Sequence, residues 1–230
     1  MITKIHEDYL NPDNERFYNE YFEFLIRRLT KLSSSLNLEN KNDSEIKLRF
    51  KNNMKAFEYL KELLLRDENL SENIVVTTAN IINNDSPYIS KGYRKIGDHI
   101  VDSDIPISSA EMIPIDVSKL LSKYETEWTE MEPFEREAKF HIEFIRIHPF
   151  EDGNGRTSRL LLNFNLLKQR LAPLVITEDL AEYYHTYIRD NDVEGMANLF
   201  RIQSTKENII MKELYNEYKQ TIHENNRKLI

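Results

Sequence analysis

The sequence predicts an all-α fold formed by a single domain, residues 1–230. The chain has only five glycines and seven prolines, and it is rich in Leu, Lys and Glu, which favour helices. Apolar residues recur at spacings of three and four along most of the chain, which is the pattern of amphipathic helices. A chain of this length can bury a substantial core.

Composition excludes several classes of function. The chain has no cysteine, so it forms no disulfide, thiolate metal site or cysteine nucleophile. Its net charge of −8 argues against broad surfaces for nucleic acid or anionic membranes. The N-terminus has no apolar core of a signal peptide, and no run approaches the ~18 apolar residues of a membrane span. We therefore expect a cytoplasmic protein with no nucleic-acid or membrane partner.

The first half of the chain predicts three helices and one irregular segment. The helices are expected over residues 13–32, 44–66 and 71–83. Between the first two, residues 33–42 are polar and predict a turn or loop. Residues 84–114 contain three prolines and two glycines, and apolar residues alternate with polar ones around position 100. We predict a small β-hairpin flap there, because such long segments usually have a function in compact domains.

The second half returns to helices. A helix is expected over residues 115–124, and another begins at Pro133, since proline is favoured in a first helical turn. That second helix ends near His148, because Pro149 disfavours helical geometry in the residue before it. Residues 157–170 are the most apolar and predict the most buried helix. Further helices are expected over residues 177–190, 192–203 and 206–228.

The stretch HPFEDGNGRTSR, His148 to Arg159, combines features of an anion site. A Gly-Asn-Gly turn that opens an apolar helix presents backbone N–H groups to an anion at the helix N-terminus. The side-chain amide of Asn154 is expected to face the same anion. Arg156 and Arg159 lie three residues apart and face one polyphosphate from the first helical turn.

His148 and Asp152 add chemistry beside this cradle. A histidine takes a proton near neutral pH, which suits a general base for a hydroxyl that attacks phosphorus. The alternative is a histidine that only caps or packs the helix. Asp152 suits Mg²⁺, which takes one or two carboxylates together with phosphate oxygens. Phe150 is expected to anchor the loop in the core, and Glu151 faces either solvent or the site.

This stretch resembles the signature of the Fic family, His-Pro-Phe-x-(Asp/Glu)-Gly-Asn-Gly-Arg-x-x-Arg, at every fixed position. The resemblance implies an all-α fold with the helix–loop–helix, residues 134–170, at its centre. It also implies an adenylyltransferase that moves AMP from ATP to a target hydroxyl and releases pyrophosphate. His148 would then deprotonate Ser, Thr or Tyr, and Asp152 would hold the Mg²⁺ between the α- and β-phosphates. The amides of Gly153, Asn154 and Gly155 would form the anion hole, and Arg156 and Arg159 would hold the β- and γ-phosphates.

Two further stretches resemble family features. Gly-Tyr-Arg at residues 92–94 is similar to the start of the flap that clamps a target backbone, which places the clamp at Asp98, His99, Ile100 and Val101. An ordinary surface hairpin is the alternative. The stretch YYHTYIRDN resembles a Tyr-Tyr pair followed by Asn that contacts adenine and ribose, and its residues here are Tyr183, Tyr184 and Asn191. One or both tyrosines are equally explained as packing residues.

The N-terminal part, residues 1–45, contains a stretch that resembles the family's inhibitory motif, (Ser/Thr)-x-x-x-Glu-(Gly/Asn)-Asn. Ser35 and Glu39 match it, and Lys41 departs from its last position. The resemblance implies that Glu39 pairs with Arg159 and misplaces ATP. A rival lies near the C-terminus, where Glu224 is followed by two asparagines but Thr221 is only three residues before it. We favour Glu39.

Other functions remain compatible with the same residues. The site would also support removal of AMP from a modified protein or transfer of another phosphate-containing group. The family's phosphotransferases typically depart from Gly-Asn-Gly, which favours AMP here. A non-catalytic, nucleotide-sensing protein is a third alternative. The expected partners are ATP, a protein with an accessible hydroxyl, and the chain itself through auto-adenylylation, while a homodimer is left open.

Overall fold

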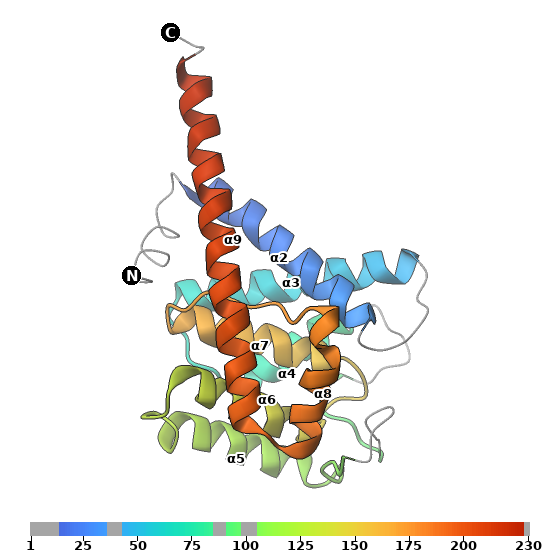
Figure 1. The fold of residues 1–230 in the computed structure, drawn as a ribbon. Helices are drawn as coiled ribbons and strands as arrows, with labels where there is room; N and C mark the ends of the chain where they lie inside the picture. Colours follow the sequence, from blue (N-terminus) through green and yellow to red (C-terminus); the bar gives the residue numbers. More distant parts are fainter. Residues whose placement is uncertain (1–13, 36–42, 85–90, 98–104, 228–230) are drawn as a thin grey trace.

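The structure is a computed structural model, which describes residues 14–35, 43–84, 91–97 and 105–227 (Figure 1). Its described residues form helices and connections without a strand, so the predicted all-α fold is confirmed. The α-helices are α2 (Glu15–Ser35), α3 (Asp43–Leu65), α4 (Glu72–Ile82), α5 (Ile113–Thr126), α6 (Pro133–Ile147), α7 (Asn154–Lys168), α8 (Ala181–Asp190) and α9 (Val193–Arg227). A short 3-10 helix, η2 (Glu178–Leu180), precedes α8.

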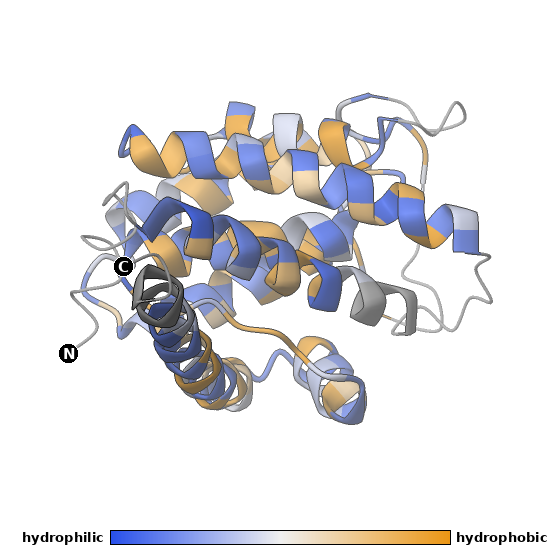
Figure 2. Cartoon of the chain, turned by 90° about the horizontal axis from the view of Figure 1, so that it is seen from above, coloured by the Kyte–Doolittle hydropathy of each residue, from blue (hydrophilic) through white to orange (hydrophobic). Residues whose placement is uncertain are grey.

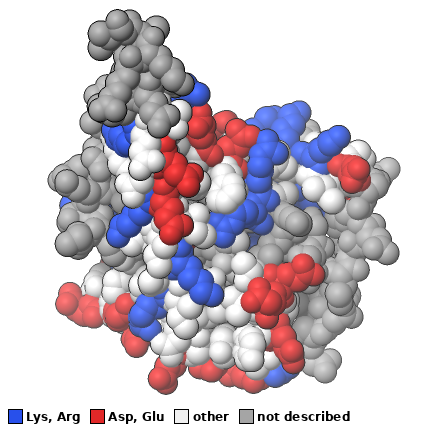
Figure 3. Space-filling view, turned by 45° about the horizontal axis from the view of Figure 1, so that its top comes forward, with Lys and Arg blue, Asp and Glu red and all other residues white. Residues whose placement is uncertain are grey.

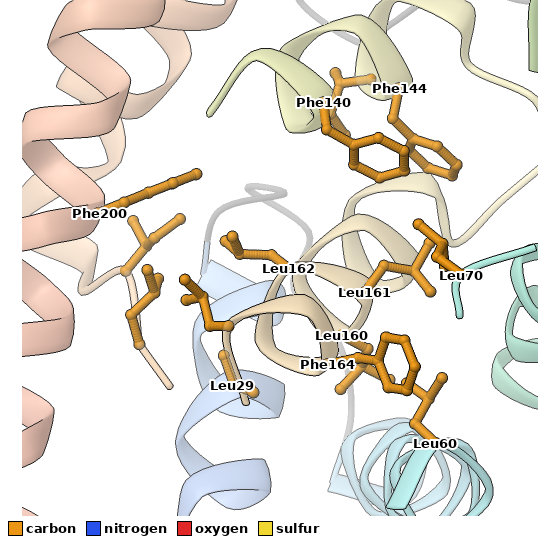
Figure 4. Packing of buried hydrophobic residues seen from close by; sticks show 14 of the residues in the cluster. Leu29, Leu60, Leu70, Phe140, Phe144, Leu160, Leu161, Leu162, Phe164 and Phe200 are labelled. Carbon is orange, nitrogen blue, oxygen red and sulfur yellow. The ribbon is translucent and has the colours of Figure 1, made fainter. Parts of the chain in front are cut away.

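Helix α7 is the centre of the core, as its apolar sequence predicts. Successive leucines of α7 point to different neighbours in Figure 4, so the helix is surrounded rather than amphipathic. Phe140 and Phe144 of α6 lie on one side and Leu60 of α3 on another, while Phe200 of α9 faces it from further away. Burial on every side fixes the direction in which the N-terminus of α7 points.

The outer helices follow the amphipathic pattern that the sequence predicts. In Figure 2 hydrophobic and hydrophilic residues alternate along them in short blocks, as expected for helices with one buried face. In α6 the buried face includes Phe134, Ala138, Ile142 and Ile145, and His141 is buried as well. Helix α9 runs past the rest of the domain toward the C-terminus (Figure 1).

The prediction of two helices over residues 192–203 and 206–228 is wrong, because α9 is continuous. Ser204 and Thr205 lie between the two predicted helices, and such side chains can compete with the backbone for hydrogen bonds. In the structure Ser204 Oγ donates to the carbonyl of Ala172 at 2.7 Å, and Thr205 Oγ1 donates to the carbonyl of Arg201 at 2.8 Å. Both hydroxyls are satisfied without interrupting the helix.

The start of α7 and the segment 84–114 also bear on the predictions. Helix α7 begins at Asn154, three residues before the expected Thr157, because Gly153 already serves as its N-cap. The described residues of the 84–114 segment, namely 84, 91–97 and 105–114, contain no strand. The predicted clamp residues fall in 98–104, outside the described residues, so the hairpin stays a prediction.

Surface charge is mixed where the structure describes it. On the face drawn in Figure 3, acidic and basic side chains are interspersed over the described residues. None of the described helices is both long and apolar enough to cross a bilayer.

A buried carboxyl group joins the helices behind the site. Glu137 of α6 is fully buried and accepts hydrogen bonds from Tyr124 Oη at 2.5 Å, Asn165 Nδ2 at 2.9 Å and Gln169 Nε2 at 2.8 Å. These donors come from α5, from α7 and from the residue that follows α7. Burial raises the pKa of Glu137 to about 7, although the three hydrogen bonds and the nearby charge of Arg136 lower it.

This network predicts a dependence of stability on pH. Between the ordinary pKa of 4.5 and about 7, the unfolded chain loses the proton of Glu137 while the folded chain keeps it. The free energy of unfolding should therefore fall as pH rises through this range, by roughly 3 kcal/mol in total. Urea unfolding of the wild type and of Glu137→Gln, measured from pH 4.5 to 8, should show this fall in the wild type relative to the variant. Identical pH profiles would contradict the prediction.

Candidate active site

The connection between α6 and α7 starts and ends with a left-handed residue. His148 caps α6 with φ 50° and ψ 60°, and Gly153 caps α7 with φ 80° and ψ 6°. Helix α6 ends where Pro149 was expected to end it, although His148 adopts the left-handed rather than the extended region. Two such residues reverse the chain within one short loop, which puts His148 beside the N-terminus of α7.

The side chain of Asn154 closes this loop. Its Oδ1 accepts the backbone N–H of Phe150 at 2.9 Å, and its Nδ2 donates to the carbonyl of Phe150 at 2.7 Å. The expectation that the Asn154 side-chain amide faces a phosphate is therefore not met in this structure, since the amide bonds to the loop itself. Phe150 is buried and stacks on Tyr93 with 5.8 Å between ring centroids, consistent with its expected role as the anchor of the loop.

Gly153 is required both by its backbone angle and by its neighbours. Its φ of 80° is rarely adopted by residues with a side chain. A Cβ at this position would lie 2.9 Å from Asn83 Oδ1 and 3.2 Å from Ile82 Cγ2. Position 153 thus places the start of α7 directly against the end of α4.

Asp152 and Arg156 form an ion pair over the start of α7. Asp152 Oδ2 accepts from Arg156 Nη2 at 2.8 Å, and Asp152 Oδ1 accepts the N–H of Gly153 at 2.5 Å. The side chain of Asp152 is 45% exposed, whereas that of Arg156 is only 7% exposed. Two hydrogen-bond donors of the predicted anion site, the N–H of Gly153 and Nη2 of Arg156, are therefore bonded to the partly exposed carboxylate of Asp152.

Burial lowers the pKa of the Arg156 guanidinium, and the charges of Arg49 and Arg159 lower it further, while Asp152 opposes them. Three arginines from α3 and α7 therefore raise the local positive potential. Arg49 was not predicted to belong to this site. It lies in α3, more than a hundred residues from Arg156 in the sequence.

Arg159 lies beneath the first turn of α7. A Cβ on Gly155 would come within 3.1 Å of Arg159 Nη1, so the second glycine of the turn makes room for this guanidinium. Arg159 is 6% exposed. Burial and the charge of Arg159 lower the pKa of His141 to about 3, so His141 is a neutral core histidine. Its Nε2 bonds to the hydroxyl of Tyr184 at 2.8 Å.

The three residues expected to contact the nucleoside are separated. Tyr184 is buried beside His141, and the nearby charge of Arg159 lowers its pKa against the larger effect of burial, so Tyr184 is a packing residue of the core. Tyr183 is 59% exposed. Asn191 caps α8 and lines a cleft of about 520 Å³, within the range of small-molecule sites. Most of the other residues that line this cleft come from α5 and α6, and most are polar or charged, among them Asp116, Lys119, Glu143 and Arg146. None of the lining residues belongs to the stretch from His148 to Arg159.

Two predicted residue sets lie outside the described part of the chain or at its edge. Asp98, His99, Ile100 and Val101 of the clamp fall in residues 98–104, and Glu39 falls in residues 36–42. Ser35 is the last residue of α2, and Glu224 lies in the last turns of α9; neither side chain is described. The roles expected for these residues stay predictions.

Two contacts with the loop could not be predicted from the sequence. Asn83, the C-cap of α4, donates from Nδ2 to the carbonyl of Asp152 at 2.8 Å and accepts from Arg156 Nη2 at 3.2 Å. The buried Arg94 donates from Nε to the carbonyl of His148 at 2.7 Å. Both residues are distant in sequence from the loop, and only Arg94 belongs to a stretch with a predicted role, the Gly-Tyr-Arg at the start of the expected flap.

Asp152 is compatible with binding one hard cation whose remaining ligands are phosphate oxygens and water. Among the described residues, no group of three or more His, Asp or Glu side chains is placed to enclose a metal ion. Asp152 is a single, partly exposed carboxylate beside an anion cradle. This suits Mg²⁺, which is bound through one or two carboxylates together with phosphate oxygens and water.

The geometry defines a class of protein: an all-α protein with a histidine beside an arginine-rich helix N-terminus. Residues 69–166, from just before α4 almost to the end of α7, match the model of the Fic/DOC family. The similarity to the Fic family that the signature indicates therefore extends from residue 69 to residue 166.

Curated relatives match over short segments. A protein adenylyltransferase fic-1 of Caenorhabditis briggsae is 47% identical over 55 residues, which cover 24% of this chain and 11% of that protein. A protein adenylyltransferase Fic of Culex quinquefasciatus is 38% identical over 82 residues, which cover 33% of this chain and 16% of that protein. The matched segments thus span less than a fifth of these relatives.

Solved structures share the fold over most of the chain. A Fic-domain-containing signaling protein of Bacteroides thetaiotaomicron has a TM-score of 0.69 at 21% identity, and the match covers 93% of this chain and 94% of that one. A Fic-1 fragment of Caenorhabditis elegans with the change E274G has a TM-score of 0.67 at 14% identity, and the match covers 96% and 71%.

Two glycine substitutions should separate backbone strain from close packing. Gly153 and Gly92 have nearly equal φ values, 80° and 82°, but a Cβ at Gly92 meets nothing within 4 Å. Gly92→Ala should cost about 1 kcal/mol and lower Tm by roughly 2–4 °C. Gly153→Ala should cost about 1–3 kcal/mol more, because Asn83 must move and lose its bonds to Asp152 and Arg156. Equal Tm values in thermal unfolding would contradict the close approach.

Proposed function

We propose that this chain transfers AMP from Mg-ATP to a hydroxyl side chain of a protein and releases pyrophosphate. The observation that carries the proposal is the joining of His148 to the arginine-rich N-terminus of α7 by one closed loop. Adenylyltransferase names among the relatives support the reaction class. The short matched segments leave the substrate to be established by experiment.

The proposed base is His148. The Nδ1 atom of its ring is buried and the residue as a whole is partly exposed, so we assign proton acceptance to Nε2. As the target hydroxyl attacks the α-phosphorus, its proton passes to Nε2. A new O–P bond forms, the bond between the α-phosphorus and the bridging oxygen breaks, and pyrophosphate leaves with that oxygen.

The proposed phosphate site is the start of α7. The backbone N–H groups of residues 153–155 and the positive end of the helix dipole stabilise the charge that develops on the phosphates. Arg156 and Arg159, both almost fully buried, attract the β- and γ-phosphates more strongly than surface arginines would. Mg²⁺ held by Asp152 would neutralise phosphate charge when bound. The N–H of Gly153 donates to Asp152 Oδ1 in this structure, so it can face a phosphate only once that bond is broken.

The nucleoside is the least constrained part of the proposal. Of the three residues expected to contact it, Asn191 is the one that lines a cleft of ligand size. We therefore retain Asn191 as a nucleoside contact. We assign Tyr184 to support of Arg159, because it is buried, bonds to His141 and interacts with Arg159.

His148→Ala should lower AMP transfer by ~10²-fold or more, as expected when a general base is removed. The assay incubates the protein and candidate targets with ATP labelled at either the α- or the γ-phosphate. The wild type should retain label only from α-labelled ATP, whereas a phosphotransferase would retain it from γ-labelled ATP. Binding of Mg-ATP to the variant should be unchanged, which controls for folding. Transfer at the wild-type rate would refute the role of His148.

We further propose that Glu39 inhibits the reaction by pairing with Arg159 and displacing the γ-phosphate. The support is the sequence resemblance around Ser35 and Glu39, together with the deep burial of Arg159, which would strengthen such a pair.

Glu39→Gly should therefore raise auto-adenylylation, measured as α-label incorporated into the chain itself, because Arg159 is then available to the γ-phosphate. Glu224→Gly is the matched control and should leave incorporation unchanged. The reverse result would move the inhibitory role to Glu224, and no change in either variant would argue against built-in inhibition by these residues.

A further inference from the structure

Arg94 is one of the most deeply buried large side chains of the protein, with 2% exposure. Its described hydrogen bonds go to backbone carbonyls rather than to a carboxylate. Nε donates to His148 O at 2.7 Å, Nη1 donates to Ile96 O at 2.9 Å, and Nη2 donates to Ser108 O. The backbone N–H of Arg94 also donates to Pro149 O at 2.9 Å. A single residue thus binds two consecutive carbonyls of the catalytic loop.

The carbonyl of His148 is a sensitive point of this loop. His148 is left-handed with φ 50°, which is an uncommon conformation for a residue with a side chain. Such conformations persist only when their surroundings fix them. Bonds from Arg94 to the carbonyls on both sides of the His148–Pro149 junction restrict how that peptide can rotate. The direction of the His148 side chain follows from the same backbone angles.

The other end of the guanidinium is held just as firmly. Ile96 belongs to the described segment 91–97 and Ser108 to the segment that leads into α5, and both give their carbonyls to Arg94. Ser108 Oγ in turn donates to Asp116 Oδ2 of α5 at 2.7 Å. Arg94 therefore connects the His148 peptide to a rigid helix through a chain of hydrogen bonds.

We infer that Arg94 is a positioning residue for His148: its guanidinium holds the left-handed His148 peptide and thereby aims the imidazole at the reacting hydroxyl. This inference rests on the proposed function, in which His148 accepts a proton. Arg94 touches no substrate in this account. Its effect is confined to the orientation of the base, and the phosphate cradle is held separately by Asn154 and Asn83.

Two substitutions test the inference kinetically. Arg94→Lys keeps a charge and can reach the His148 carbonyl, but one ammonium group cannot span the sites that a guanidinium fork spans. Arg94→Met removes every side-chain donor. We expect kcat for AMP transfer to fall about 10-fold in Arg94→Lys and about 100-fold in Arg94→Met, since small misplacements of catalytic groups have effects of this order. The Kd of Mg-ATP should stay within about twofold of the wild-type value.

Arg136→Lys is the matched control. Arg136 is a half-buried arginine near the start of α6, the helix that His148 caps at its other end. Its Nη2 donates to the carbonyl of Tyr124 at 2.6 Å. This variant should lower Tm without lowering kcat. A wild-type kcat in folded Arg94→Met would overturn the inference. So would a parallel loss of kcat and ATP affinity that follows the loss in Tm, because that pattern indicates a structural role alone.

A measurement independent of activity separates this inference from the proposed function. The three-bond HN–Hα coupling and the ¹³Cα shift of His148 report its φ angle by NMR. We expect a left-handed value in the wild type and a shift toward negative φ in Arg94→Lys. An unchanged φ would overturn the positioning role even if kcat falls. Absence of AMP transfer in both the wild type and Glu39→Gly would refute the proposed function, while this NMR result would still decide the role of Arg94.

If neither variant folds, amide hydrogen exchange measured on the wild type still tests the role of Arg94. If Arg94 and the loop form one unit, the amide of Arg94, bonded to Pro149 O, and the amide of Phe150, bonded to Asn154 Oδ1, should open together. Their protection factors should agree within about tenfold. Exchange at Arg94 that is more than about a hundredfold faster would overturn the inference.

Discussion

The candidate site depends on the two hydrogen bonds between the Asn154 side chain and the backbone of Phe150. They satisfy both polar groups of a buried residue inside a tight loop, where water could not do so. Because the loop is closed in this way, α6 and α7 can meet at an angle set by two left-handed residues, His148 and Gly153. The histidine and the helix N-terminus become neighbours through this closure.

The core behind the loop determines what the site can bind. Helix α7 is buried on all sides, so its N-terminal N–H groups and the guanidinium groups of Arg156 and Arg159 lie where the dielectric constant is low. Burying charges of one sign is costly, and the ion pair with Asp152 only partly offsets the cost. An anion that approaches this helix therefore gains more free energy than it would at an exposed helix end.

Local features of this architecture were predictable from the sequence. The helices follow from apolar spacing, and the loop follows from proline and glycine at positions where few other residues are tolerated. The continuity of α9 was not predicted, and Ser204, at the expected break, bonds to Ala172, a residue 32 positions earlier that sequence spacing does not bring near it. The role of the Asn154 side chain was also missed, because an amide suits a phosphate and a peptide group equally well.

Two of the residues that sequence analysis missed, Arg94 and Asn83, have one property in common. Arg94 binds through carbonyl groups, and Asn83 binds the carbonyl of Asp152 as well as the side chain of Arg156. Every residue supplies a carbonyl, so such a partner leaves no trace in residue type or spacing. A signature such as His148 to Arg159 therefore contains the proposed substrate-binding groups and the loop-closing Asn154, whereas the supporting contacts of Arg94 and Asn83 appear only once the chain is folded. A loop with all its signature residues would still be misaligned if the arginine behind it were lost.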